Sequence, residues 1–143
     1  MKGMIDSLIN ILIQKGVLVK KRHIKQISKI FLNKDSLRNF IEDFIKQKEY
    51  FLENPQFYID NIKKIERLKY IKIKEPIYSY KYKKNIFKSN NKNIRCLFFV
   101  YDDKIIVLDI FEENDDNGSK YKEAIRRAIL EYRNIVEGGK DED

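Results

Sequence analysis

The chain has 143 residues, of which 43% are hydrophobic and 13% aromatic, and its formal net charge at pH 7 is +8. This length and composition predict a globular protein with a single packed core. The one cysteine, Cys96, excludes an internal disulfide, and the longest uninterrupted apolar run, Cys96 to Tyr101, is too short to span a bilayer. We therefore expect a cytoplasmic protein with no membrane segment.

The first part of the chain, residues 1–54, carries three apolar patterns with helical spacing. A brief apolar run at residues 16–19 fits either a strand or a turn. An N-cap is expected before the third helix, because Asn and Ser side chains can accept a hydrogen bond from the first free backbone N–H groups. The expected helices are Met4–Ile13, ended by Gly16; Ile24–Phe31; and Leu37–Leu52, capped within Asn33–Ser36 and stopped at Asn54-Pro55.

After Pro55 the spacing of apolar residues changes from helical to strand-like. A fourth helix is expected from Phe57 to Leu68, and alternating residues then indicate a strand from Ile71 to Tyr82. Two further strands, joined by a tight turn, are followed by a last helix that begins at Ser119. The second and third strands are Ile94–Tyr101 and Lys104–Phe111, their turn is Asp102-Asp103, and the last helix stops at Gly138-Gly139.

This order predicts an α+β fold with N-terminal helices, an antiparallel β-meander, a C-terminal helix and a sheet covered on one side. We expect one compact domain, with residues 1–54 as a helical layer, residues 55–137 as the α+β core and residues 138–143 as a flexible tail. The apolar stripes of Met4–Phe31 predict either an extra layer or a surface for a partner. The oligomeric state is left open.

The positive charge is concentrated in the middle of the chain. Residues 63–104 hold 13 basic and 4 acidic residues, whereas residues 105–143 hold 6 and 11. Such a patch predicts binding to nucleic-acid phosphates that weakens steeply with salt. The alternative is that AT-rich codon usage alone makes the chain rich in lysine. Such a bias would not explain why the final third of the chain is acidic.

Residues 55–136 resemble the RelE/ParE/HigB superfamily of toxins from toxin-antitoxin systems and their phage-derived relatives. The resemblance is carried by three strand-like segments, Ile77–Lys81, Ile94–Phe99 and Ile105–Phe111, and by the helical segment Tyr121–Ala128. It implies a RelE-like fold and a metal-independent endoribonuclease that cleaves mRNA, including ribosome-bound mRNA. It also implies a small antitoxin as partner. We expect no cofactor, and no metal site, because the chain has only one Cys and one His.

The same resemblance assigns roles to individual residues. Arg95 would grip the scissile phosphate with a bidentate fork, Lys81 and Lys83 would act as base or electrostatic clamp, and Tyr82 or Tyr80 would stack on a base. The alternative is that Lys81, Lys83 and Arg95 are solvated on an open sheet face and the tyrosines pack against a helix. The other predicted nucleic-acid-binding residues are Lys63, Lys64, Arg67, Lys69, Lys84, Lys88 and Lys92.

One departure from the family pattern bears on catalysis. Glu112 and Glu113 follow the last strand, where the family usually has lysines. Carboxylates there would repel an RNA phosphate, which leaves a second function open: a non-catalytic nucleic-acid- or protein-binding module on the same scaffold, such as a ParE-like gyrase inhibitor or a phage-encoded inhibitor.

Cys96 is expected to be a buried apolar residue and His23 a surface residue.

Overall fold

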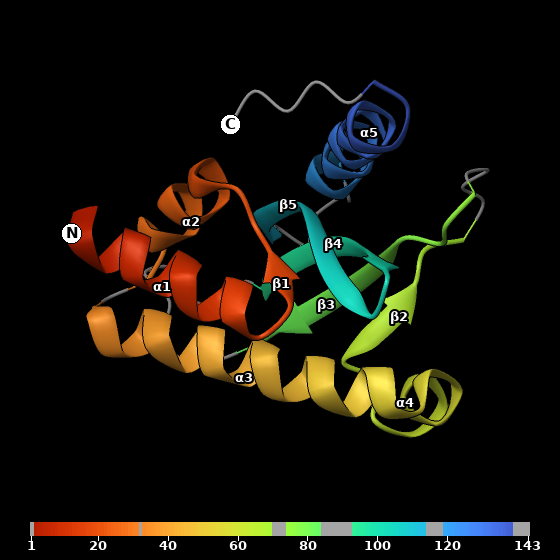
Figure 1. Cartoon of the computed structure of the whole chain (residues 1–143), viewed down its shortest axis with the longest axis horizontal. Helices are drawn as coiled ribbons and strands as arrows, with labels where there is room; N and C mark the ends of the chain where they lie inside the picture. The colour runs from red at the N-terminus through yellow and green to blue at the C-terminus, as the bar shows by residue number, and fades with distance from the viewer. Residues whose placement is uncertain (1, 32, 70–73, 84–92, 114–118, 139–143) are drawn as a thin grey trace.

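The computed structural model describes residues 2–31, 33–69, 74–83, 93–113 and 119–138 (Figure 1). A short first strand lies between the first and second helices, and the other strands lie between the fourth helix and the last. The helices are α1 (Lys2–Gln14), α2 (Lys21–Ser28), α3 (Lys34–Glu53), α4 (Pro55–Asn61) and α5 (Ser119–Arg133), which continues as a π-helical turn, η1 (Asn134–Gly138). The strands are β1 (Val17–Leu18), β2 (Ile65–Arg67), β3 (Tyr78–Tyr82), β4 (Asn93–Tyr101) and β5 (Lys104–Glu113).

The five strands form one mixed sheet in the order β1-β5-β4-β3-β2. Strands β3 to β5 form the predicted antiparallel meander, and β2 extends it antiparallel to β3, whereas β1 lies parallel to β5, with Val17 opposite Ile105. The run at residues 16–19 therefore contains a strand. The α+β class is confirmed, and the sheet gains a parallel edge that the sequence pattern did not predict.

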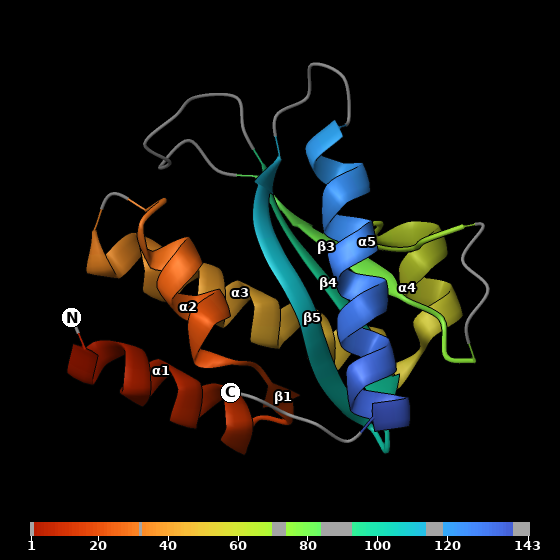
Figure 2. The ribbon, with the colours of Figure 1, turned by 90° about the horizontal axis from the view of Figure 1, so that it is seen from above.

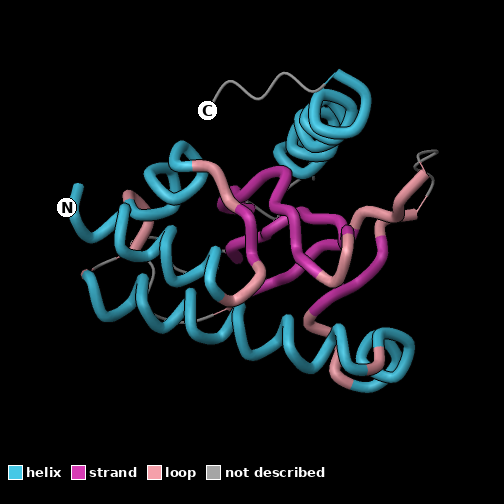
Figure 3. The backbone as a smooth tube through the Cα atoms, in the orientation of Figure 1, coloured by secondary structure: helices cyan, strands magenta, loops and turns pink. Residues whose placement is uncertain are grey.

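Helices cover both faces of this sheet, with α1 to α3 on one side and α5 on the other (Figures 2 and 3). Phe98 packs in the cluster shared with α1 to α3, while its neighbours Leu97 and Phe99 pack in the cluster of α5. Three consecutive buried residues are typical of a strand enclosed on both faces. The expectation of a sheet covered on one side is therefore wrong.

The N-terminal helices contribute to the larger of the two apolar clusters. Leu8, Leu12, Ile24 and Phe31 are buried together with residues of β3 and β4.

Within the described residues, no helix has both the length and the apolar character needed to cross a membrane.

Local sequence signals explain how α3 and α4 begin. The side chain of Asn33 accepts a hydrogen bond from the Ser36 backbone N–H at 2.9 Å, which confirms the predicted N-cap. Asn54 caps α4 in the same way, and Pro55 follows at the first helical turn, where its missing N–H costs nothing. The predicted stop at Asn54-Pro55 is confirmed, and a new helix starts there.

Helix α4 is shorter than predicted. It ends at Asn61, and Lys63 then adopts a left-handed backbone with a φ of 66°. The next residues form β2, in which Ile65 pairs with Tyr80. The predicted helix from Phe57 to Leu68 is therefore wrong over its second half. The predicted strand residues Ile71 and Ile73 lie outside the described part of the chain, as does most of the predicted tail.

Candidate nucleic-acid interface

The three residues predicted to be catalytic lie on β3, just beyond its end, and near the start of β4. Lys81 is the direct ladder partner of Arg95, so their side chains project to the same face of the sheet. This is the α5 face, because Leu97 and Phe99 alternate with Arg95 along β4 and pack against α5. Lys81 is exposed, as is Lys83 just beyond the end of β3. The register thus brings two of the predicted residues together, and the third follows at the strand end.

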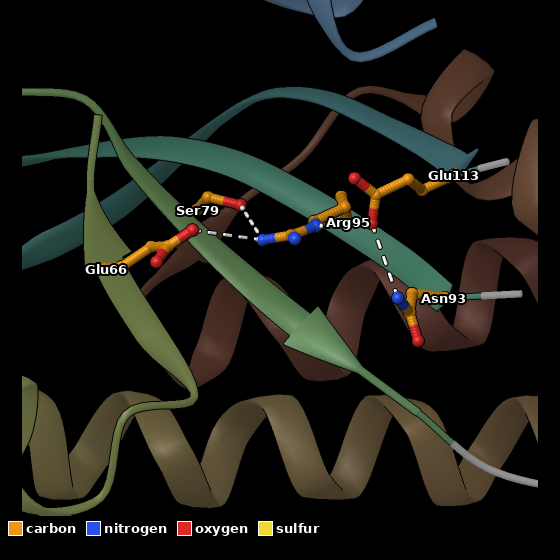
Figure 4. Close-up of polar contacts among 5 residues, drawn as sticks. All are labelled: Glu66, Ser79, Asn93, Arg95 and Glu113. Carbon is orange, nitrogen blue, oxygen red and sulfur yellow. Dashed lines mark hydrogen bonds and ion pairs between the residues drawn. The ribbon is translucent and has the colours of Figure 1, made fainter. Parts of the chain in front are cut away.

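Arg95 is held by two carboxylates (Figure 4). Its Nε donates to Oε1 of Glu113 at 2.9 Å, and its Nη1 donates to Oε1 of Glu66 at 3.3 Å. Nη1 also donates to Oγ of Ser79 at 3.3 Å, while Nδ2 of Asn93 donates to the same Glu113 oxygen at 3.3 Å. Residues of β2, β3 and β5 therefore converge on the guanidinium group of Arg95 in β4.

The inner part of this cluster is shielded from solvent. The side chains of Arg95 and Glu113 are 12% and 10% exposed, whereas that of Glu66 is 60% exposed. The ring of Tyr121, in the first turns of α5, lies 4.8 Å from the Arg95 guanidinium carbon and adds a cation–π contact. Burial lowers the pKa of Arg95, but Glu113, Tyr121 and Glu66 outweigh it and raise the pKa overall, so the group remains charged.

This geometry differs from the open fork that the resemblance implies. Two donor groups of Arg95, Nε and Nη1, already bind carboxylates and a hydroxyl group. The proposed bidentate contact with a phosphate stays a prediction, and it requires the phosphate to compete with Glu113 for Nε or with Glu66 for Nη1. Lys81 and Lys83 differ from Arg95, because within the described part of the chain neither forms an ion pair.

The predicted stacking of a nucleic-acid base on Tyr80 or Tyr82 is wrong, because both rings are buried. They pack against the rings of α3: Tyr82 lies 5.1 Å from Phe40 and Tyr80 lies 4.9 Å from Phe44, measured between ring centroids. The alternative, in which the aromatic stripe of β3 packs against a helix, is confirmed.

The hydroxyl group of Tyr80 takes part in a polar network beneath the sheet. It donates to Oδ2 of Asp43, whose Oδ1 accepts from Nε2 of Gln47 at 3.3 Å. Tyr58 donates to Oε1 of Gln47 at 2.6 Å, and Nζ of Lys64 lies 3.7 Å from Oδ1 of Asp43. Burial, and secondarily the negative charge of Asp43, raise the pKa values of Tyr80 and Tyr58 well above the ordinary value. Both phenols therefore stay neutral and serve as structural donors.

The predicted basic surface lies on and around β2, the edge strand next to β3. Its described members, Lys63, Lys64, Arg67 and Lys69, are all exposed. The backbone N–H of Lys81 donates to the carbonyl of Lys64 at 2.9 Å, so the chain just before β2 lies beside β3, although the Nζ of Lys64 itself lies near Asp43. Lys84, Lys88 and Lys92 lie outside the described residues.

The sequence pattern missed several members of the Arg95 cluster. Ser79 and Lys81 alternate along one strand, and this spacing was the signal that could have placed Ser79 beside Arg95. Glu66 was assigned to a helix, which hid its position on the neighbouring strand. Tyr121 gave no signal, because only the packing of α5 brings it over Arg95. The sequence pattern predicted that Glu113 would repel a phosphate, and the structure shows that its carboxylate binds Arg95.

The other candidate residues are buried. Cys96 is fully buried, as expected, and burial raises its pKa well above the ordinary value, which disfavours the thiolate needed by a nucleophile. His23 is also buried, so the expectation of a surface histidine is wrong. Across residues 2–31, 33–69, 74–83, 93–113 and 119–138, no group of three or more His, Cys, Asp or Glu residues is arranged to hold a metal ion.

Two hollows lie away from these cations, towards the C-terminal end of α5. They have volumes of about 350 and 180 Å³ and share the apolar residues Ile106 and Ile135. Tyr121 places the Arg95 cluster at the other end of this helix of 15 residues. The hollows are therefore separate from the candidate interface.

Comparison of the chain with protein-family models, with curated proteins and with solved structures found no match.

Proposed function

We propose that this protein binds nucleic acid, with RNA as the first choice, through the cations of β2 and β3, as a non-catalytic module on a RelE-like scaffold. The observation that carries this proposal is the exposure of Lys81 and Lys83, which form no ion pair in the described part of the chain, next to the exposed cations on and around the neighbouring strand β2. Cations of this kind gain most by replacing the counterions of a polyanion.

The engagement of Arg95 favours binding over cleavage. A phosphoryl-transfer site needs cations that face the charge developing on the phosphate. Arg95 instead faces Glu113 and Glu66, so the described geometry leaves the transition state without its strongest expected partner. On the family pattern, the protein would act in the cytoplasm and a small antitoxin would cover the cationic surface.

The binding proposal is tested by the affinity for a fluorescein-labelled single-stranded RNA, measured by anisotropy over a range of salt concentrations. Replacing two phosphate-binding cations should reduce the slope of log K against log salt by about 1.4, since each contact to a single strand contributes about 0.7. We expect this reduction in Lys81→Ala/Lys83→Ala. The matched control is Lys25→Ala/Lys29→Ala, which removes the same charge from exposed positions in and just after α2.

An equal loss of affinity in both variants would show that only the net charge matters, and absence of RNA binding by the unmodified protein would contradict the proposal. Duplex DNA of the same length serves as the competitor. Stronger binding to the duplex would show that the ligand is DNA and that the same cationic surface binds it.

A second candidate function is the RelE-like endoribonuclease, and the observation that favours it is the placement of Lys81 directly opposite Arg95. Its test is inducible expression in a bacterium, scored by growth and by the integrity of total mRNA. The informative variant is Lys81→Ala/Lys83→Ala, because substitution of Arg95 would also break a buried ion pair. Growth arrest with mRNA cleavage, lost in this variant, would support the enzyme. Growth arrest with intact mRNA would favour a protein target such as gyrase, and normal growth would contradict a toxin acting in that host.

A further inference from the structure

Arg95 binds its carboxylates through the donor groups that would also bind a phosphate. The guanidinium group has a planar fork of N–H donors that fits carboxylate and phosphate oxygens equally well. In the described structure, Glu113 takes Nε and Glu66 takes part of Nη1. A phosphodiester that binds bidentately through Nε and Nη2 would therefore compete with the Glu113 carboxylate for Nε.

The charges around Arg95 allow such an exchange. Glu66 and Glu113 carry two negative charges, and Arg95 with its ladder partner Lys81 carries two positive charges. A phosphodiester carries one negative charge, as an ionised carboxylate does. Its entry in place of Glu113 would keep the local charge balanced, so Arg95 would not be left buried without a counter-ion.

Glu113 is held by few hydrogen bonds in the described part of the chain. It is the last described residue of β5 and pairs with Asn93, the first described residue of β4. Its described hydrogen bonds, from Arg95 and Asn93, are both to Oε1. By contrast, Asp109, which pairs with Arg127, lies within β5 and accepts through both carboxylate oxygens.

We propose that Glu113 is a built-in competitor for phosphate at Arg95, and that Arg95 is a latent phosphate-binding residue which the RNA backbone exposes by displacing the Glu113 carboxylate. This inference rests on the proposed binding of RNA. It goes further in giving the acidic end of β5 a function, the restriction of access to the most buried cation of the surface.

The test compares RNA affinity and its salt dependence in Glu113→Gln and in Glu42→Gln, a control that removes the same charge from an exposed position on α3. Glutamine keeps the shape of the side chain and can still accept from Arg95. Glu113→Gln should bind RNA about three- to tenfold more tightly, with a salt slope steeper by about 0.7 because one more phosphate is engaged. Adding Arg95→Gln to Glu113→Gln should abolish this gain, and Glu42→Gln should show at most a small gain without a change in slope.

Glu66→Gln provides a second variant in case Glu113→Gln folds poorly. Glu66 is largely exposed, so its substitution disturbs little of the core, and it should give a smaller gain that also depends on Arg95. If the protein binds RNA and neither variant exceeds Glu42→Gln, the competitor role is wrong while the binding proposal stands. If neither the unmodified protein nor any variant binds RNA, the proposed function itself is wrong.

Discussion

Arg95 and Glu113 bind each other diagonally across the β4–β5 ladder, in which Arg95 stands opposite Phe111 and Glu113 stands opposite Asn93. Both side chains are nearly buried, so each serves as the counter-ion of the other. Loss of one partner from a buried ion pair leaves an uncompensated charge, whereas joint replacement by apolar residues costs far less.

We therefore predict that Arg95→Met lowers the free energy of unfolding by about 3 to 5 kcal/mol. The double substitution Arg95→Met/Glu113→Leu should recover a large part of this loss. Urea unfolding followed by circular dichroism measures both, and Arg126→Met, at an arginine side chain that is 68% exposed, is the control with an expected effect of about 0.5 kcal/mol or less. An additive loss in the double variant would contradict the coupling.

The Tyr80–Asp43 contact predicts how stability depends on alkaline pH. Burial first, and then Asp43, raise the pKa of Tyr80 above the value of 10.0 that it has when exposed. Above about pH 10 the unfolded chain releases this proton and the folded chain retains it, so the folded state loses stability as pH rises. The stabilising contribution of the neutral phenol is fully present below that pH.

We expect Tyr80→Phe to lose less stability between about pH 8 and about pH 11 than the unmodified protein, because the variant has one buried phenol fewer to ionise on unfolding. At about pH 8 the variant should instead be less stable by about 1 to 2 kcal/mol, since Asp43 loses a donor. Urea unfolding at the two pH values provides the measurement. Tyr50→Phe, at an exposed tyrosine of α3, is the control for the loss of a phenol from the surface. Equal pH dependence in Tyr80→Phe and the unmodified protein would show that Tyr80 is not the group involved.

Elements of the fold with local causes could be predicted from the sequence. Asn33 caps α3 through a residue three positions away, Pro55 begins α4, and Asp102-Asp103 turns β4 into β5. Strand β2 could not be predicted in this way, because the spacing of Ile62, Ile65 and Leu68 fits a helix. Only pairing with β3 makes this segment a strand, and that contact is not local.

In the candidate interface, too, local features could be predicted and long-range contacts could not. The alternation of residues along the strand predicted that Lys81 and Lys83 are exposed, and the sequence placed a cation, Arg95, on the next strand. The ion pairs of Arg95 depend on the register of four strands, and the cation–π contact depends on the packing of α5. The sequence therefore shows an acidic residue at position 113, but only the fold shows that its partner is Arg95.

The turn between β4 and β5 predicts a stabilising substitution. Asp102 and Asp103 have φ values of 55° and 61°, as in a type I′ turn, where the second position strongly prefers glycine. Because an L-residue is strained in this region, Asp103→Gly should raise the free energy of unfolding by about 0.5 to 1 kcal/mol, although glycine gains freedom in the unfolded chain. Asp103→Ala should lower it, because alanine keeps the steric cost and loses the polar side chain that tolerates this backbone. Chemical denaturation compares the three proteins, and a destabilising glycine would contradict the assigned turn.

The place of the N-terminal helices is tested by two neighbouring residues of α1. Leu12 is 1% exposed and packs in the same cluster as Phe98 of the sheet, whereas Ile13 is 48% exposed. Leu12→Ala should lower the free energy of unfolding by about 2 to 5 kcal/mol, because it leaves a cavity in the shared core, while Ile13→Ala should cost much less. Removal of residues 1–32 should give an insoluble or unfolded product for the same reason. A soluble, folded product that starts at Asn33 would instead show that α1 and α2 form a separate layer, and similar effects of the two alanine substitutions would point to the same conclusion.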